Sequence, residues 1–226
     1  ELLASLGYTA EAQAERGKVM QFAGDGNIKA QLVISLEDDN IGESPQYNAA
    51  SIAQLYQVID DYQLDGYYGR QWLISKMDPA AFYMARANWD RNVTVEETYL
   101  DLLTNVCGVD AVDAALAAFV LGERVTLQEA AKSFLVPVMV SNQFDGAEPV
   151  PESWSENIRM YEQMTTHFDQ ALAVSREAGK PFLEKLRHQA QFAVHWHRAI
   201  TDVRRAGKLR QQADKARDEV QDVESY

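Results

Sequence analysis

Cysteine is nearly absent from this chain, which has one, Cys107, among 226 residues. A single cysteine cannot form a disulfide within the chain, so the fold must be stabilised by packing. The sequence also lacks any run of 18 apolar residues, and no basic segment followed by an apolar one opens it. We therefore expect neither a membrane-spanning helix nor an N-terminal targeting segment.

Basic residues are in the minority. The chain has 21 Lys and Arg against 34 Asp and Glu, which gives a net charge of -13. Such a charge repels the phosphate backbone of nucleic acids and an anionic membrane surface. One basic stretch, residues 197–217, is interleaved with acids such as Asp202 and Asp214, a pattern typical of a solvated helix face. Neither nucleic acid nor membrane is expected as a partner.

Several motifs that mark common chemistries are missing. The sequence has no Gly-rich phosphate loop, no GxSxG nucleophile elbow and no CxxC pair. His195 and His197 lie two residues apart in a predicted helix, so they point to different sides of it and cannot grip one zinc ion together. No cofactor and no resident metal is predicted.

Two short apolar runs flank one helix-like segment in the first third of the chain. The first run, from Gln31 to Leu36, is almost continuously apolar, which is typical of a parallel strand covered on both faces. The second runs from Leu64 to Tyr68, and the segment between them, capped by Asn48, has apolar residues at helical spacing. The sequence therefore predicts a βαβ unit with parallel strands.

Carboxylates follow the first predicted strand directly. Glu37, Asp38 and Asp39 come in a row, and Asn40 follows them. Parallel sheets carry their chemistry at the carboxyl ends of the strands, and glycoside hydrolysis needs one protonated and one ionised carboxyl group. We predict Glu37 and Asp38 as catalytic carboxylates and Asn40 as a residue that orients a sugar hydroxyl. The same cluster also fits a Ca²⁺ or Mg²⁺ site, or a solvated loop.

Aromatic and cationic residues lie at the end of the second predicted strand. Tyr68 and Trp72 offer flat apolar faces that suit a sugar ring, and Arg70 offers donors for hydroxyl or carboxylate groups. These three residues are predicted to bind substrate. In the alternative interpretation Trp72 lies in the core and Arg70 pairs with an acid of the neighbouring strand.

The second half of the chain is predicted to be helical. Three Ser/Thr–Glu pairs have the spacing of a capping box, which marks a helix start: Thr94 with Glu97, Thr126 with Glu129, and Ser153 with Glu156. Two long helices, separated at Gly179 and Pro181, should pack as an antiparallel pair. Beyond Gly207 the tail is charged and is predicted to fray or to form a marginal last helix.

The segment YMARANWDRNVTVEETYLDLLTNVCG, residues 83–108, resembles the part that follows the last barrel strand in several large glycoside hydrolases. The alpha-glucuronidases and alpha-N-acetylglucosaminidases are most similar. The residues that carry the resemblance are Trp89, Asp90, Thr94, Glu97 and Gly108. PFLEKLRHQAQFAVHWHRAI, residues 181–200, is similar to the long terminal helix of those enzymes. The resemblance implies that the two strands are the seventh and eighth of a TIM-type barrel.

These patterns predict an α/β fold followed by a mainly α one. Residues 1–92 would form the last βα units of a TIM-type barrel, and residues 93–226 a C-terminal helical domain. The other barrel strands would come from another chain or from a segment before Glu1.

The predicted function is that of the C-terminal portion of a glycoside hydrolase, which cleaves a poly- or oligosaccharide by carboxylate acid/base catalysis. Two alternatives stay open. The first is a non-catalytic helical interaction or carbohydrate-binding module. The second is a small metal-dependent α/β hydrolase that holds Mg²⁺ with the acid cluster.

Overall fold

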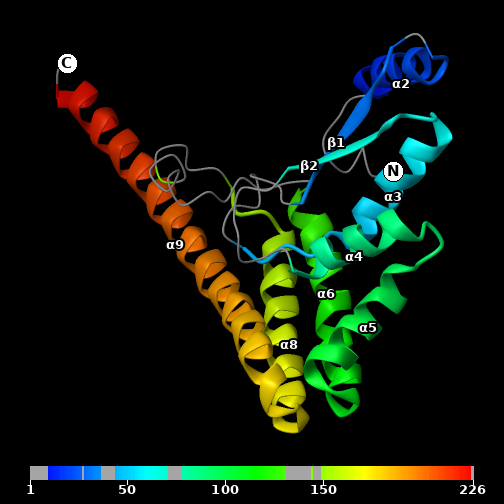
Figure 1. Cartoon of the computed structure of the whole chain (residues 1–226). Helices are drawn as coiled ribbons and strands as arrows, with labels where there is room; N and C mark the ends of the chain where they lie inside the picture. Colours follow the sequence, from blue (N-terminus) through cyan, green and yellow to red (C-terminus); the bar gives the residue numbers. More distant parts are fainter. Residues whose placement is uncertain are drawn as a thin grey trace.

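The computed structural model describes residues 10–26, 28–36, 44–70, 78–130, 144 and 149–224. Most of them are helical (Figure 1). In chain order the elements are α2 (Ala10–Gly24), β1 (Gln31–Ser35), α3 (Ala49–Asp61), β2 (Gly66–Arg70), α4 (Asp78–Trp89), α5 (Val95–Cys107), the 3-10 turn η1 (Val109–Ala111), α6 (Val112–Ala130), α8 (Ser153–Val174), the 3-10 turn η3 (Glu177–Gly179) and α9 (Lys180–Glu224). None of the helices in the described ranges is long and apolar enough to cross a membrane.

The fold is mainly α, and the predicted α/β end of a TIM-type barrel is wrong. Within the described residues the only sheet has two strands, and all later elements are helices. These later helices, α6, α8 and α9 above all, pack against one another instead of covering a sheet (Figure 1). The prediction failed because a short apolar run followed by a helix is equally compatible with one isolated βαβ unit and with part of a barrel.

The βαβ unit itself is confirmed. Strands β1 and β2 pair in parallel, and α3 is the crossover between them. Their register places Leu32 opposite Tyr67 and Val33 opposite Tyr68. The second strand begins at Gly66, two residues later than the predicted start at Leu64.

Among the described residues, helices cover only one face of this sheet. Leu32, Ile34 and Tyr67 pack in the hydrophobic core, and the Tyr67 ring lies 5.1 Å from the ring of Tyr56 in α3. On the other face, Val33 is 60% exposed and Tyr68 is 63% exposed. Since strand side chains alternate between faces, the apolar run of β1 does not imply cover on both sides. The predicted cover of β1 on both faces is therefore wrong.

One hydrophobic core runs from the sheet into the helical bundle. It includes Ile34 of β1, Tyr99 of α5, Phe119 of α6 and Phe168 of α8, all of them fully buried or nearly so. The Phe119 ring centre lies 5.0 Å from that of Tyr99 and 6.4 Å from that of Phe168. Residues on both sides of the predicted boundary at 92–93 contribute to this cluster, and the boundary stays a prediction.

The three predicted capping boxes have different outcomes. At the start of α5, the Thr94 hydroxyl accepts the Glu97 N–H at 3.1 Å, and the Glu97 carboxylate accepts the Thr94 N–H at 2.9 Å. This box is confirmed. Thr126 lies inside α6, so the second box is wrong. The third pair does lie at a helix start, since α8 begins at Ser153, but the residue before it provides no side-chain capping bond.

Helices α8 and α9 run in opposite directions on either side of η3, as predicted (Figure 1). Helix α9 has 45 residues and is therefore about 67 Å long at 1.5 Å per residue. Its C-terminal part continues as helix to Glu224, so of the two alternatives predicted beyond Gly207 the structure shows a helix, which continues α9 without a break. Figure 1 shows this part of α9 leaving the bundle.

Candidate functional site

The carboxyl ends of β1 and β2 lie side by side. Ser35, the last residue of β1, is in register with Arg70, the last residue of β2. The segments that follow the two strands therefore leave the same edge of the sheet. This is the arrangement on which the sequence-based site depends.

Most of the predicted site residues lie outside the described residues. These are Glu37, Asp38, Asn40 and Trp72. Of the others, Tyr68 lies on the open face of the sheet beside Val33, and Arg70 ends β2. The roles assigned to all six residues stay predictions.

A carboxylate that the sequence analysis missed lies close to this edge. Glu123 of α6 is partly buried and accepts the backbone N–H of Ala49 at 2.9 Å and that of Ala50 at 3.3 Å. Its carboxylate also accepts the hydroxyl of Tyr99. Ala49 and Ala50 are the first residues of α3, whose N–H groups have no partner inside the helix. Glu123 therefore caps α3 from a different helix.

The predicted cap of α3, Asn48, has another role. It precedes the helix, as expected, but its side chain makes no capping bond there. Its amide instead donates to the backbone oxygen of Leu36 at 2.6 Å. Asn48 thus ties the end of β1 to the start of α3, while the carboxylate of Glu123 takes the helix N–H groups.

Burial dominates the electrostatics of this cluster. Loss of solvent raises the pKa of Glu123 above its ordinary value, although the hydrogen bonds from Tyr99, Ala50 and Ala49 act in the opposite direction. The pKa of Tyr99 and that of Tyr47 are raised by burial first and by the Glu123 carboxylate second. Both hydroxyls therefore stay protonated at neutral pH and can donate hydrogen bonds.

The segment that leads into α3 carries buried polar atoms without a protein partner. Ser44 Oγ, Tyr47 Oη and Asn48 Oδ1 have no hydrogen-bond partner in the part of the chain that the structure describes. Tyr47 is held firmly in place, because its ring lies against Gly122, where a side chain would collide with it, and its N–H donates to Thr126 at 2.8 Å. All three atoms are buried from solvent, so they are not exposed to a ligand in this conformation.

The titration of Glu123 makes a testable contribution to stability. Because its pKa is raised from 4.5 in the folded protein, the folded state holds this proton more tightly than the unfolded state does. The resulting stabilisation is complete below the ordinary pKa and is lost as the pH rises through the raised value. Glutamine does not titrate. We expect the free energy of unfolding of the wild type, relative to Glu123→Gln, to fall as the pH rises above 4.5.

Chemical denaturation of both proteins at each pH measures this difference. Subtracting the free energy of unfolding of the variant from that of the wild type removes the contributions of the other carboxylates, which are common to both proteins. A difference that stays constant, or that rises with pH, would show that the pKa of Glu123 is not raised in the folded protein.

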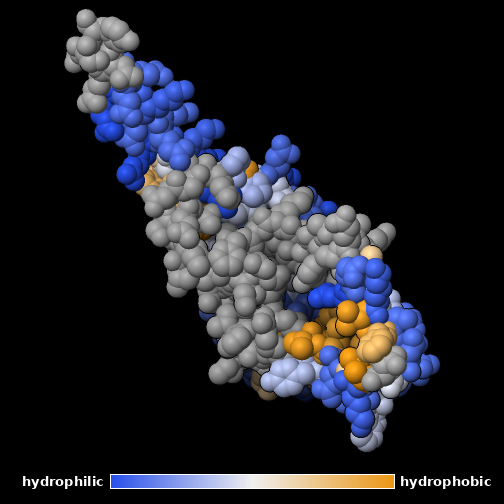
Figure 2. Space-filling view, turned by 90° about the horizontal axis from the view of Figure 1, so that it is seen from above, coloured by the Kyte–Doolittle hydropathy of each residue, from blue (hydrophilic) through white to orange (hydrophobic). Residues whose placement is uncertain are grey.

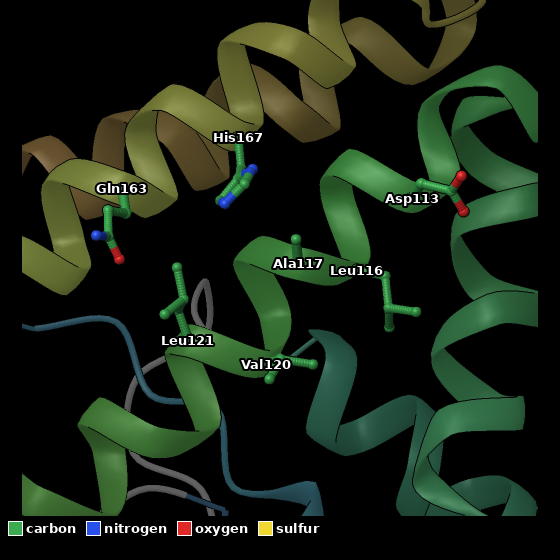
Figure 3. A pocket seen from close by; sticks show the side chains of 7 residues that line it. All are labelled: Asp113, Leu116, Ala117, Val120, Leu121, Gln163 and His167. Carbon is green, nitrogen blue, oxygen red and sulfur yellow. The ribbon is translucent and has the colours of Figure 1, made fainter.

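A separate groove lies between α6 and α8 (Figure 3). It has a volume of about 480 Å³ and is lined by Asp113, Leu116, Ala117, Val120, Leu121, Gln163 and His167. In Figure 3, His167 and Gln163 come from α8 and the other five from α6. The lining is mainly apolar and has a single carboxylate and no aromatic ring besides His167, so it lacks the carboxyl pair that glycoside hydrolysis needs.

Two other side chains that could react, Cys107 and His197, are buried inside the protein. Burial raises the pKa of the Cys107 thiol to about 11, so it is not a thiolate nucleophile at neutral pH. His197 is fully buried on α9, with its ring 5.4 Å from that of Trp154 and 5.5 Å from that of Tyr161. Among the described residues no group of three or more His, Cys, Asp or Glu is placed to hold a metal ion.

Comparison of the chain with models of known protein families, with curated proteins and with solved structures found no match.

Proposed function

We propose that the chain acts on carbohydrate as part of a glycoside hydrolase, with its site at the carboxyl ends of β1 and β2. Glu37 or Asp38 acts as an acid/base carboxylate, and a second carboxylate comes from another segment or another chain. The observation that supports this best is the parallel pairing of β1 with β2. Because of it, the acidic segment after Ser35 and the segment after Arg70 start from neighbouring points on one edge.

The exposed aromatic ring on the sheet supports a sugar as the ligand. Tyr68 of β2 is 63% exposed on the open face of the sheet. Such a ring offers a flat apolar face that suits the apolar face of a sugar. In this proposal Asn40, Tyr68, Arg70 and Trp72 complete the contacts with the sugar.

A second candidate function is that of a non-catalytic interaction or carbohydrate-binding module. The mainly helical fold favours it, because the described part of the chain has a two-stranded sheet in place of the barrel that the hydrolase resemblance implies. The protruding end of α9 also offers a large surface for a partner (Figure 1).

A screen of the protein against chromogenic glycosides and uronides separates the two functions. The hydrolase proposal predicts release of the chromophore from at least one substrate. Calorimetric titration with oligosaccharides would follow in parallel. Binding without release would favour the module, and neither binding nor release would remove carbohydrate as the ligand.

A further inference from the structure

The C-terminal part of α9 stands apart from the rest of the molecule. From residue 205 to residue 220, a segment called the arm below, every residue is exposed except Gly207, which is buried, and Asp214, which is half-buried. In Figure 2 this part extends from the body as a largely hydrophilic arm. A single exposed helix of this length is only marginally stable in water, so a partner along it would add stability.

The arm carries a regular apolar stripe. Ala206, Leu209, Ala213, Ala216 and Val220 follow one another at steps of three, four, three and four residues. This is the spacing of the a and d positions of a coiled coil, which lie along one side of a helix. Its two large members are unprotected, since Leu209 is 65% exposed and Val220 is 57% exposed.

Charge is unevenly distributed along the same arm. Arg205, Lys208 and Arg210 lie near its start, with no acid among residues 203–213. Residues 214–224 carry five acids, at 214, 218, 219, 222 and 224, against two bases, Lys215 and Arg217, so this end is acidic in sum. A second copy of the arm placed in the opposite direction would bring each basic end against an acidic end, whereas a parallel copy would align like charges.

We propose that α9 forms an antiparallel two-stranded coiled coil with a second copy of this chain. In the register that matches the apolar stripes, Leu209 of one copy lies beside Val220 of the other, and Ala213 lies beside Ala216. The alanines at the centre let the two helices approach closely, and the larger side chains at either end fill the seam. The apolar stripe of one copy therefore fits against the same stripe of a second copy that runs in the opposite direction.

Contacts already made by the arm are compatible with this pairing. Arg210 lies 3.6 Å from Asp214 and Lys215 lies 3.9 Å from Glu219, but these are exposed ion pairs within one helix and contribute little. Phe144 packs on Gly207 and lies 5.4 Å from the guanidinium of Arg210. Gly207 and Arg210 lie next to the stripe and not in it, and Leu209 and Val220 of the stripe remain exposed.

Sedimentation equilibrium over a wide range of concentration tests the association. We expect the mass of the wild type to rise from that of a monomer to that of a dimer, and to fall again when salt is added. Leu209→Glu should stay monomeric throughout. The matched control Gln211→Glu, on a different side of the helix, should behave as the wild type. A wild type that stays monomeric at every concentration would overturn the proposal.

Disulfide exchange tests the direction of the helices. In a glutathione buffer, a mixture of Leu209→Cys and Val220→Cys chains should form the mixed dimer, because these positions meet in the antiparallel register. A preference of Leu209→Cys for pairing with itself would show a parallel arrangement and overturn the proposal. Gln211→Cys is the control and should form no preferred pair, and the native Cys107 is fully buried.

Discussion

The double variant Glu37→Gln, Asp38→Asn is expected to lose glycoside hydrolysis by a factor of about 10²–10⁴ in turnover. Both substitutions keep the size of the side chain and remove its ability to exchange a proton. If either carboxylate is the acid or base, its loss removes proton transfer in the transition state. The substrate should still bind, so the change should appear in kcat more than in KM.

Steady-state kinetics with the best substrate of the screen measures this loss. Glu96→Gln is the matched control, because Glu96 is an exposed acid in the first turn of α5, away from the strand ends, and its turnover should equal that of the wild type. Unchanged turnover in the double variant would remove both acids from the mechanism.

Replacement of Glu123 by alanine is expected to lower the free energy of unfolding by about 3 kcal/mol. The substitution leaves the N–H groups of Ala49 and Ala50 and the hydroxyl of Tyr99 without their acceptor. Each unsatisfied buried group costs about 1–3 kcal/mol, and partial access to water reduces the sum. For a chain of this size, a loss of about 3 kcal/mol lowers Tm by about 6–12 °C.

Thermal and chemical denaturation measure this loss. Arg124→Ala is the control on the neighbouring position of α6, because Arg124 makes an exposed ion pair with Glu156 and its removal should cost less than about 1 kcal/mol. Equal stability of the wild type and Glu123→Ala would mean that α3 does not depend on this carboxylate.

The local elements of the fold could be predicted from the sequence, but their assembly could not. The strand of β1, the crossover helix and the cap at Thr94 each leave a signal within a few residues. The number of strands in a sheet leaves no such signal. Val33 illustrates the difficulty, because a valine in a strand has the same appearance in the sequence whether a helix covers it or, as here, water does.

For a related reason, the arrangement of the two strand ends could be predicted, but the buried carboxylate near them could not. The pairing of the two strand ends followed from the βαβ pattern, whereas Glu123 lies 74 residues from the helix that it caps. A weak signal for it does exist. Glu123 follows Gly122 at the end of the apolar segment of α6, and an acid placed there requires a buried donor nearby. Which donor that is depends on tertiary packing, which the sequence does not display.

The most direct test of the account is to locate the reactive carboxylate chemically. An epoxyalkyl glycoside of the sugar found in the screen would be incubated with the intact protein, and peptide mass spectrometry would identify the carboxylate that opens the epoxide and forms an ester. We predict the ester on Glu37 or Asp38, directly after β1. An ester on Asp113 in the groove between α6 and α8, or on any other distant acid, would contradict a carbohydrate site at the strand ends.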